Sequence, residues 1–401
     1  MGDGTHRGGE PDKLLAGCAD LAQIVHNPPY RDWACTLSAG STSSTEMVYR
    51  MFLEKGDYVI SEDYTFATAV ETAHPLGCKC IGVAMDSEGM LPDALDELLT
   101  TWDEAARGAR KPFLVYTIPT GQNPTGATQG AERRRQIYAV AQKHDLVIIE
   151  DEPYYFLQMQ PYTGPGQPPA PLPANHKEFL NSMIPSLLSM DVDGRVIRLD
   201  SFSKVLAPGS RCGWVVAPEQ VCERMQRHAE VSSYPAGISQ VIIHRLVDEE
   251  WGHGGYLDWL INLRVEYTQR RDVLVKACDD HLPHEVCSWT PPAAGMFHWV
   301  RLDVSKHPDF GKRSVQSIED EVFTTAVAGG VLITPGSYFL ADTEKELEHI
   351  FFRATFAAAA VCFPWTVARR INALTGLQSE AMVEAIKRFG VAVRQVFRIK
   401  N

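Results

Sequence analysis

Short apolar runs rich in β-branched and aromatic residues alternate with longer helical patterns from about residue 36 onward. The runs occur at 58–60, 80–85, 112–118, 146–149, 195–199 and 214–217. The segments between them are typical of amphipathic helices. Residues 131–145, for example, place apolar side chains at 137 and 139–141, with basic residues opposite. Strands that alternate with crossover helices predict an α/β protein with a mostly parallel sheet covered on both faces.

Two interruptions divide this pattern. The proline-rich stretch 161–176 is unsuited to a helix or a central strand, so we expect an exposed excursion from the sheet. The sequence Trp-Thr-Pro-Pro within 288–292 ends a long helical region, and further strand-like and helix-like segments follow it. We therefore expect a residual N-terminal segment (1–35), a large domain (36–290) and a smaller C-terminal α+β domain (291–401).

The overall charge narrows the function classes. The chain of 401 residues has 38 basic and 50 acidic residues and a net charge of −12. This charge argues against a protein that binds nucleic acid by neutralising phosphates. The nine cysteines form no C-x-x-C pair and no Cys/His cluster, so we expect no metal site and a reducing compartment.

The sequence shows no targeting feature. Its apolar runs fall short of the roughly 18 residues that a membrane helix needs, and the stretch MGDGTHRGGEPDK is polar rather than signal-like. We expect a cytoplasmic protein without a membrane partner.

Four groups of polar residues follow strand-like runs, where ligands gather in parallel sheets. The first group is Gly40, Ser41 and Thr42, just before a helical pattern. Free backbone N–H groups and the two hydroxyls would form an anion cradle. Ser43 and Glu46 have the spacing of a capping box, so an ordinary helix cap is the alternative.

The second and third groups supply an amide and a carboxylate. Asn123 lies in the loop TIPTGQNPTG and could donate to an oxygen held over the strand ends, although the loop alone is weak evidence. Asp151 follows a buried run and needs a cation or hydrogen-bond donors, for which a protonated heteroaromatic nitrogen is suitable. An aspartate that caps its own turn is the alternative.

The fourth group surrounds a lysine. Lys204 follows the run 195–199, with Ser201 and Ser203 beside it and Arg211 seven residues later. A lysine near another cation and partly out of water has a lowered pKa, which makes its amine a candidate nucleophile. A solvated surface lysine is the alternative.

Together the four groups match what pyridoxal phosphate requires. This cofactor needs phosphate ligands, a partner for its phenolic oxygen, an anion at its ring nitrogen and an amine for its aldehyde.

The sequence resembles the fold-type I pyridoxal-phosphate-dependent aminotransferases. Within them it is similar to fungal aromatic amino acid and 2-aminoadipate aminotransferases and to kynurenine/aminoadipate aminotransferase. The matching stretches are GST at 40–42, EDYTF at 62–66, HPLG at 74–77, IPTGQNPTG at 118–126, EDEPYYFLQ at 150–158, SMDVDGRVIRLDSFSK at 189–204, PAAGMFHW at 292–299 and FFRATF at 351–356. The resemblance implies a large domain with a seven-stranded sheet and a smaller C-terminal domain.

The resemblance also implies how the cofactor is held. Lys204 binds it covalently, and Asp151 pairs with its ring nitrogen and keeps that nitrogen protonated. Asn123 and Tyr154 bind the phenolic oxygen, and Tyr64 stacks on the ring. The phosphate ligands are Ser41, Thr42, Ser201, Ser203 and Arg211.

The implied reaction is a ping-pong transfer of an α-amino group. The donor is an aromatic amino acid, kynurenine or 2-aminoadipate, and the acceptor is a 2-oxo acid such as 2-oxoglutarate. Arg353 binds the substrate α-carboxylate in a bidentate fork, next to Asn123. The freed amine of Lys204 acts as general base and acid. The resemblance implies a homodimer as well.

Two features depart from the family pattern. Family members have a further segment before the position that matches residue 1, including an arm that packs on the partner subunit. Residues 361–378 form an insertion between the strand that carries Arg353 and the last helix, and a retained intron is one hypothesis for its origin. These departures leave open a truncated paralogue that binds the cofactor with impaired catalysis.

Other reaction classes fit less well. Ser201 and Lys204 have the S-x-x-K spacing of serine acyl-enzymes, but K-T-G and S-D-N are absent. No G-x-G-x-x-G follows a strand-like run, and neither a P-loop nor an H-E-x-x-H sequence occurs. A lyase or decarboxylase that uses the same cofactor stays open, because this scaffold supports several reactions.

Overall fold

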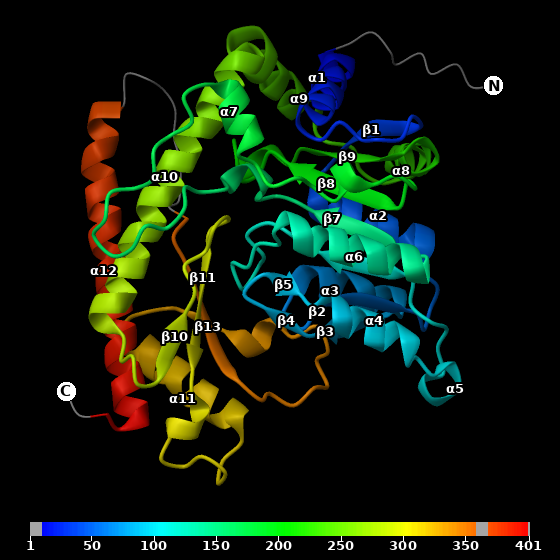
Figure 1. Ribbon diagram of the computed structural model, residues 1–401. Helices are drawn as coiled ribbons and strands as arrows, with labels where there is room; N and C mark the ends of the chain where they lie inside the picture. The colour runs from blue at the N-terminus through cyan, green and yellow to red at the C-terminus, as the bar shows by residue number, and fades with distance from the viewer. Residues whose placement is uncertain (1–9, 358–367, 400–401) are drawn as a thin grey trace.

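A seven-stranded sheet forms the centre of the larger part of the molecule in the computed structural model, which describes residues 10–357 and 368–399 (Figure 1). The strands, in spatial order, are β1 (Trp33–Ser38), β9 (Gly213–Pro218), β8 (Val196–Ser201), β7 (Val147–Asp151), β6 (Leu114–Thr117), β2 (Tyr58–Glu62) and β3 (Lys79–Val83). The strands from β8 to β3 are parallel, whereas β9 and β1 are antiparallel to their neighbours. The predicted mostly parallel sheet is confirmed.

Helices cover both faces of this sheet. α2 (Ser41–Phe52) and α3 (Ala67–Ala73) lie on one face, and α4 (Pro92–Thr100) and α6 (Ala131–His144) lie on the other (Figure 1). Right-handed crossovers explain this division, because the β2-to-β3 connection crosses the sheet in the opposite direction to the β3-to-β6 and β6-to-β7 connections. Val115, Ile148 and Ile149 are fully buried between the two layers.

One part of the α6 prediction was wrong. Its basic residues were expected on the outer side of the helix, but Arg134 is fully buried. Its guanidinium pairs with Glu150 and Glu152, two carboxylates at the end of β7. Amphipathic spacing identifies which residues share a face, and it does not reveal charges that meet partners in the interior.

Further helices pack around the β1 edge of the sheet. α1 (Glu10–Val25) contacts β1 and α9 (Gly237–His244), and α8 (Glu219–Val231) contacts β1 and β9. The remaining short elements are the β4 (Met85–Asp86) and β5 (Gly89–Met90) hairpin, α5 (Glu104–Arg107) and α7 (His176–Asn181). The described stretch 161–175 contains no helix or strand, as expected from its prolines.

A four-stranded antiparallel sheet forms the smaller part of the molecule. Its strands, in spatial order, are β10 (Cys287–Trp289), β11 (Phe297–Leu302), β13 (Ile350–Thr355) and β12 (Thr334–Pro335). The helices of this part are α11 (Val315–Ala328) and α12 (Ala368–Phe397), and α10 (Gly252–His281), which follows a π-helical turn at Arg245–Glu250, leads from the larger part and packs against α12. Among the described helices, none combines the length and the hydropathy of a membrane span.

The expected limit after residue 35 and the expected insertion at 361–378 can be compared with the observed helices and strands. β1 crosses the limit after residue 35, and we propose that α1 and β1 belong to the large domain and that the small domain begins near residue 291. Of the expected insertion 361–378, residues 361–367 lie outside the described residues, and α12 begins at Ala368.

Candidate active site

A buried carboxylate lies where β7 ends. Asp151 is the last residue of this strand and is 3% exposed. Tyr116 of the neighbouring strand β6 donates a hydrogen bond of 2.6 Å to its Oδ2, whereas Oδ1 has no hydrogen-bond partner among the described residues. Burial raises the pKa of Asp151 to about 6. The hydroxyls of Tyr116 and Ser41 lower this pKa, and Oδ1, which makes no hydrogen bond of normal geometry within the described part of the chain, can accept a donor from a ligand.

Lys204 lies near this carboxylate and two guanidinium groups. It follows β8, which pairs with β7 in parallel register. Burial lowers the pKa of Lys204, and the charges of Arg211 and Arg353 lower it further, while Asp151 acts in the opposite direction. A lowered pKa leaves more of the amine neutral, as a nucleophile or base requires.

Arg211 closes an anion cradle at the start of α2. Its guanidinium donates to the backbone oxygen of Ala39 at 2.9 Å and to Ser203 Oγ at 3.4 Å. Ser201 Oγ in turn donates to Ser203 Oγ at 2.9 Å. Gly40 has a φ of +102°, and a Cβ at this position would lie 2.6 Å from Arg211 Nη2. The positive φ favours glycine at this position, and any Cβ here would displace the Arg211 guanidinium from the cradle.

The start of α2 differs from the capping box considered above. The helix begins at Ser41, with Gly40 at the N-cap and no side-chain hydrogen bond to the cap. Glu46 instead pairs with Arg50. The first backbone N–H groups thus have no side-chain cap, and the buried Ser41 Oγ makes no hydrogen bond of normal geometry to a described residue, although it lies close enough to Asp151 to lower the pKa of that carboxylate. Both features suit an anion such as phosphate.

The small sheet contributes Arg353. Its Nη1 donates to Asn123 Oδ1 at 2.8 Å, which links β13 to the loop after β6. The rings of Phe297 and Phe339 lie 4.5 and 4.6 Å from the guanidinium carbon. Two aromatic contacts and one hydrogen bond hold the guanidinium, which keeps further N–H donors for a carboxylate. Tyr154 is buried beside Phe297, with ring centroids 5.8 Å apart.

Two predicted residues are not joined to this cluster by any described contact. The ring of Tyr64 packs edge-on against Trp299 and Phe351, with centroids 5.5 and 5.3 Å away. It lines a cavity of about 780 Å³ that contains neither Asp151 nor Lys204. Thr42 is exposed at the start of α2. Their cofactor roles stay predictions without a supporting contact.

Some residues of the site were missed from the sequence. Tyr116, in β6, and Phe339, in a turn before β13, contact predicted site residues from separate parts of the chain. The only available signal for Tyr116 was its position near the end of an apolar run, a feature that many buried tyrosines share. Its contact with Asp151 depends on β6 lying beside β7, which the chain order alone does not specify.

Comparisons with known proteins identify the class. The family described as aminotransferase class I and II matches residues 2–360. An aromatic amino acid aminotransferase of Schizosaccharomyces pombe is 47% identical over 340 residues, which cover 84% of this chain and 71% of that protein. The mitochondrial kynurenine/alpha-aminoadipate aminotransferase of Bos taurus is 33% identical over 359 residues, which cover 87% and 76%.

A solved structure gives the same answer for the fold. The crystal structure of aminotransferase Aro8 from Candida albicans matches with a TM-score of 0.85 and 42% identity, over 96% of this chain and 78% of that chain. Fold and sequence together define an enzyme of the aminotransferase class with the fold-type I architecture. The chain belongs to the class I and II aminotransferase family, which implies pyridoxal phosphate as its cofactor.

The described residues fit that cofactor. Asp151 Oδ1 has no partner and can accept from a ring N–H group, and the uncapped helix start beside Arg211 can receive a phosphate. Lys204 supplies an amine whose pKa is lowered. No group of three or more metal-ligating side chains occurs among the described residues.

Proposed function

We propose that this aminotransferase uses aromatic amino acids, kynurenine or 2-aminoadipate as amino donors and a 2-oxo acid such as 2-oxoglutarate as acceptor. The observation that carries the proposal is that the parallel strands β7 and β8 bring Asp151 and Lys204 to one edge of the sheet. At this edge Arg211 contacts Ser203, and Arg353 contacts the loop after β6. A covalent anchor, a ring-nitrogen partner, a phosphate ligand and a carboxylate ligand thereby come together. The names of the similar proteins support the donor classes.

Different residues would hold different parts of the cofactor. Pyridoxal phosphate supplies an electron sink for the carbanion formed at the substrate α-carbon. Asp151 would accept a hydrogen bond from the ring nitrogen and keep it protonated. Asn123 and Tyr154 would contact the phenolic oxygen. The proposed phosphate ligands are Ser41, Thr42, Ser201, Ser203 and Arg211.

Two residues act on the substrate, one by binding its carboxylate and the other by transferring a proton. Arg353 binds the α-carboxylate, with its guanidinium held by Phe297, Phe339 and Asn123. Lys204 Nζ accepts the proton from the substrate α-carbon and later returns it. The lowered pKa of this amine favours the neutral form that can accept the proton. The aromatic rings around Arg353 support a preference for aromatic donors.

A surface patch supports the proposal of a homodimer. The patch, here called the α9 patch, consists of Val231, Tyr234, Ile238 and Ile242. These side chains are between 42% and 84% exposed, and exposed apolar residues grouped in this way are typical of a protein interface. The eight cysteines of the described residues are all free, which supports the proposal of a reducing, cytoplasmic location.

A single-turnover measurement tests the reaction. The protein loaded with pyridoxal phosphate is mixed with phenylalanine in the absence of a 2-oxo acid. We expect about one equivalent of phenylpyruvate per active site, and continuous turnover once 2-oxoglutarate is added. Lys204→Ala should lower the rate about 10³-fold or more.

The matched control is Lys143→Ala, which alters an exposed lysine of α6 and should keep full activity. Release of carbon dioxide or ammonia would support the lyase or decarboxylase alternative. Absence of any product would support an impaired paralogue. Either result contradicts the proposal.

A further inference from the structure

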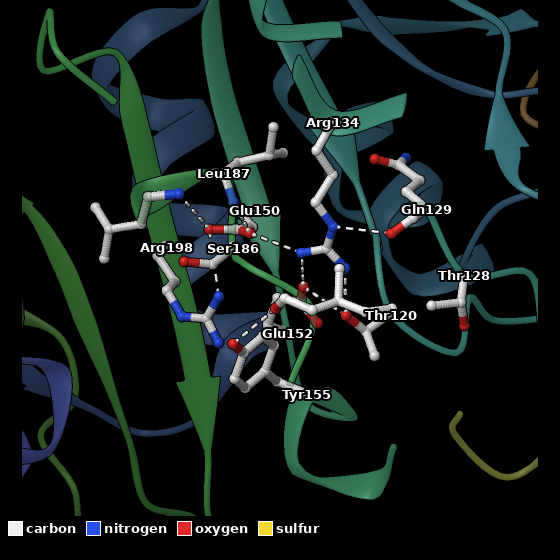
Figure 2. Close-up of polar contacts among 12 residues, drawn as sticks. Thr120, Thr128, Gln129, Arg134, Glu150, Glu152, Tyr155, Ser186, Leu187 and Arg198 are labelled. Atoms are coloured by element: carbon white, nitrogen blue, oxygen red, sulfur yellow. Dashed lines mark hydrogen bonds and ion pairs between the residues drawn. The ribbon is translucent and has the colours of Figure 1, made fainter. Parts of the chain in front are cut away.

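Five charged side chains form a buried cluster on the α6 face of the sheet. Figure 2 shows four of them, Arg134, Glu150, Glu152 and Arg198. This cluster, here called the ionic cluster, consists of Arg134, Glu150, Glu152, Arg198 and Asp200. Each of the five residues is at most 2% exposed. Arg134 lies 3.2 Å from Glu152 and 3.5 Å from Glu150, and Arg198 lies 3.3 Å from Glu150 and 2.7 Å from Asp200.

The ionic cluster lies on the opposite face of the sheet from the cofactor residues. Side chains alternate along a strand, so Glu150 and Glu152 point toward α6 while Asp151 points toward α2. The cluster therefore does not touch the predicted ring-nitrogen partner directly. The charge of Asp200 helps to raise the pKa of Asp151 across the sheet, whereas an effect on the geometry of the site has to pass through the backbone or through a connected loop.

Arg134 is attached to both ends of such a loop. Residues 118–130 connect β6 to α6. Near the start of the loop, Arg134 Nη2 donates to Thr120 Oγ1 at 2.7 Å, and this hydroxyl donates to Glu152 Oε1 at 2.9 Å. Near its end, Arg134 Nε donates to the backbone oxygen of Gln129 at 3.0 Å. The two ends also meet directly, since Gln129 N donates to the oxygen of Pro119 at 2.8 Å.

The middle of the same loop carries Asn123. Its Oδ1 accepts the 2.8 Å hydrogen bond from Arg353, the residue proposed to bind the substrate carboxylate. A continuous set of contacts thus runs from Glu152 through Thr120 and the loop to the guanidinium. A displacement of about 1 Å in a substrate-binding group can cost about 10²-fold in rate, so the loop position matters for catalysis.

Stability alone does not explain such a cluster. Buried ion pairs often contribute no more to stability than well-packed apolar side chains of the same volume. Two guanidinium groups also face three carboxylates, and burial raises the pKa of Glu152 to about 7. Directional hydrogen bonds, in contrast, fix geometry in a way that apolar contacts do not.

We propose that Thr120 and Arg134 are positioning residues for substrate binding. They fix the loop 118–130 so that Asn123 orients the guanidinium of Arg353. The proposal rests on the proposed role of Arg353 as the carboxylate ligand.

The test compares Thr120→Val with Thr120→Ser. Valine has a similar shape but lacks the hydroxyl, whereas serine keeps it. In the protein loaded with pyridoxal phosphate, we expect Thr120→Val to raise the KM for phenylalanine about tenfold, with a change in kcat of less than about threefold. The KM of Thr120→Ser should stay within about twofold of the wild-type KM.

A binding measurement and a control variant separate positioning from a general loss of stability. The affinity for 3-phenylpropanoate, a carboxylate without an amino group, is measured by calorimetry and should fall about tenfold in Thr120→Val. The control is Thr72→Val in α3, which removes a partly buried hydroxyl that donates to a backbone oxygen at 2.6 Å. This control should lower the melting temperature without changing the KM or the affinity.

The possible results lead to different conclusions. If Thr120→Val lowers only the melting temperature, the ionic cluster is merely structural and the inference is overturned, while the proposed function stands. If the wild type does not transaminate but binds 3-phenylpropanoate, and Thr120→Val weakens that binding, the proposed function fails and the positioning role stands. Arg134→Met should reproduce the Thr120→Val effect if it folds.

Discussion

Burial rather than charge pairing sets the protonation of the carboxylates at the ends of the central strands. Asp151 and Glu62 are almost completely inaccessible, and burial raises their pKa values to about 6 and about 7. Glu62 accepts a hydrogen bond from Thr117 through one oxygen, whereas its other oxygen has no partner among the described residues. Its ionised form is therefore costly in the folded protein.

A pH titration of stability tests this conclusion for Glu62. Because its pKa rises from 4.5 to about 7 on folding, the folded state loses stability as the pH rises from about 4.5 through about 7. Glu62→Gln has no charge to bury and should escape this loss. The difference in the free energy of unfolding between Glu62→Gln and the wild type should therefore grow in favour of the variant across this window, by at most about 3 kcal/mol.

Urea unfolding at several pH values measures this difference. Glu97→Gln, on the exposed side of α4, is the control and should show no comparable pH dependence. If the difference between Glu62→Gln and the wild type stays constant from pH 5 to pH 8, Glu62 does not titrate in this window and the explanation is wrong.

At the scale of elements, two backbone segments from different sheets touch at the site. Gly121, in the loop after β6, faces Gly295, just before β11. Their φ values are +58° and +78°. A Cβ on Gly121 would lie 2.5 Å from the backbone nitrogen and Cα of Gly295. This contact lets the loop that carries Asn123 approach the small sheet that carries Arg353.

Gly121→Ala should therefore separate the two segments. We expect a loss of about 3 kcal/mol in the free energy of unfolding, from the positive φ and the backbone clash together. Denaturant unfolding measures it. The control is Gly17→Ala in α1, where a Cβ meets no atom within 4 Å. Because alanine favours a helix, this control should be neutral or more stable by up to about 1 kcal/mol. Equal effects of the two substitutions would refute the contact.

At the scale of the whole molecule, the α9 patch is the feature that a single chain leaves unexplained. Ile238 and Ile242 are four residues apart on α9, so they project from the same side of the helix. They are 77% and 60% exposed. A second copy of the chain is the partner that we propose for this surface.

Ile242→Lys tests the proposed dimer. A lysine in the middle of an apolar interface has to lose its hydration, so we expect the dissociation constant of the dimer to rise at least about tenfold. Sedimentation velocity over a range of concentrations measures it. Leu332→Lys is the control, because Leu332 is 83% exposed outside the patch. If both variants dimerise like the wild type, the α9 patch is not the interface.

The sequence alone was sufficient to predict the sheet and most of the residues that gather at its edge. Strand-forming runs and helical periodicity depend on local side-chain chemistry, and parallel strands deliver their carboxyl ends to one edge wherever they lie in the chain. Asp151 and Lys204 could be predicted to lie at this edge for this reason, and Arg211 because it follows Lys204 by seven residues. The resemblance to a known family added the prediction that Arg353 binds the substrate carboxylate.

Only the tertiary structure decided which neighbours these residues have. The contact between Tyr116 and Asp151 depends on the order of strands, and the burial of Arg134 depends on two carboxylates at the end of β7. The link from Arg353 to Asn123 joins residues that are 230 positions apart. Local pattern contains no information about such pairs, because they are fixed by the packing of the whole chain, which also sets the pKa values through burial.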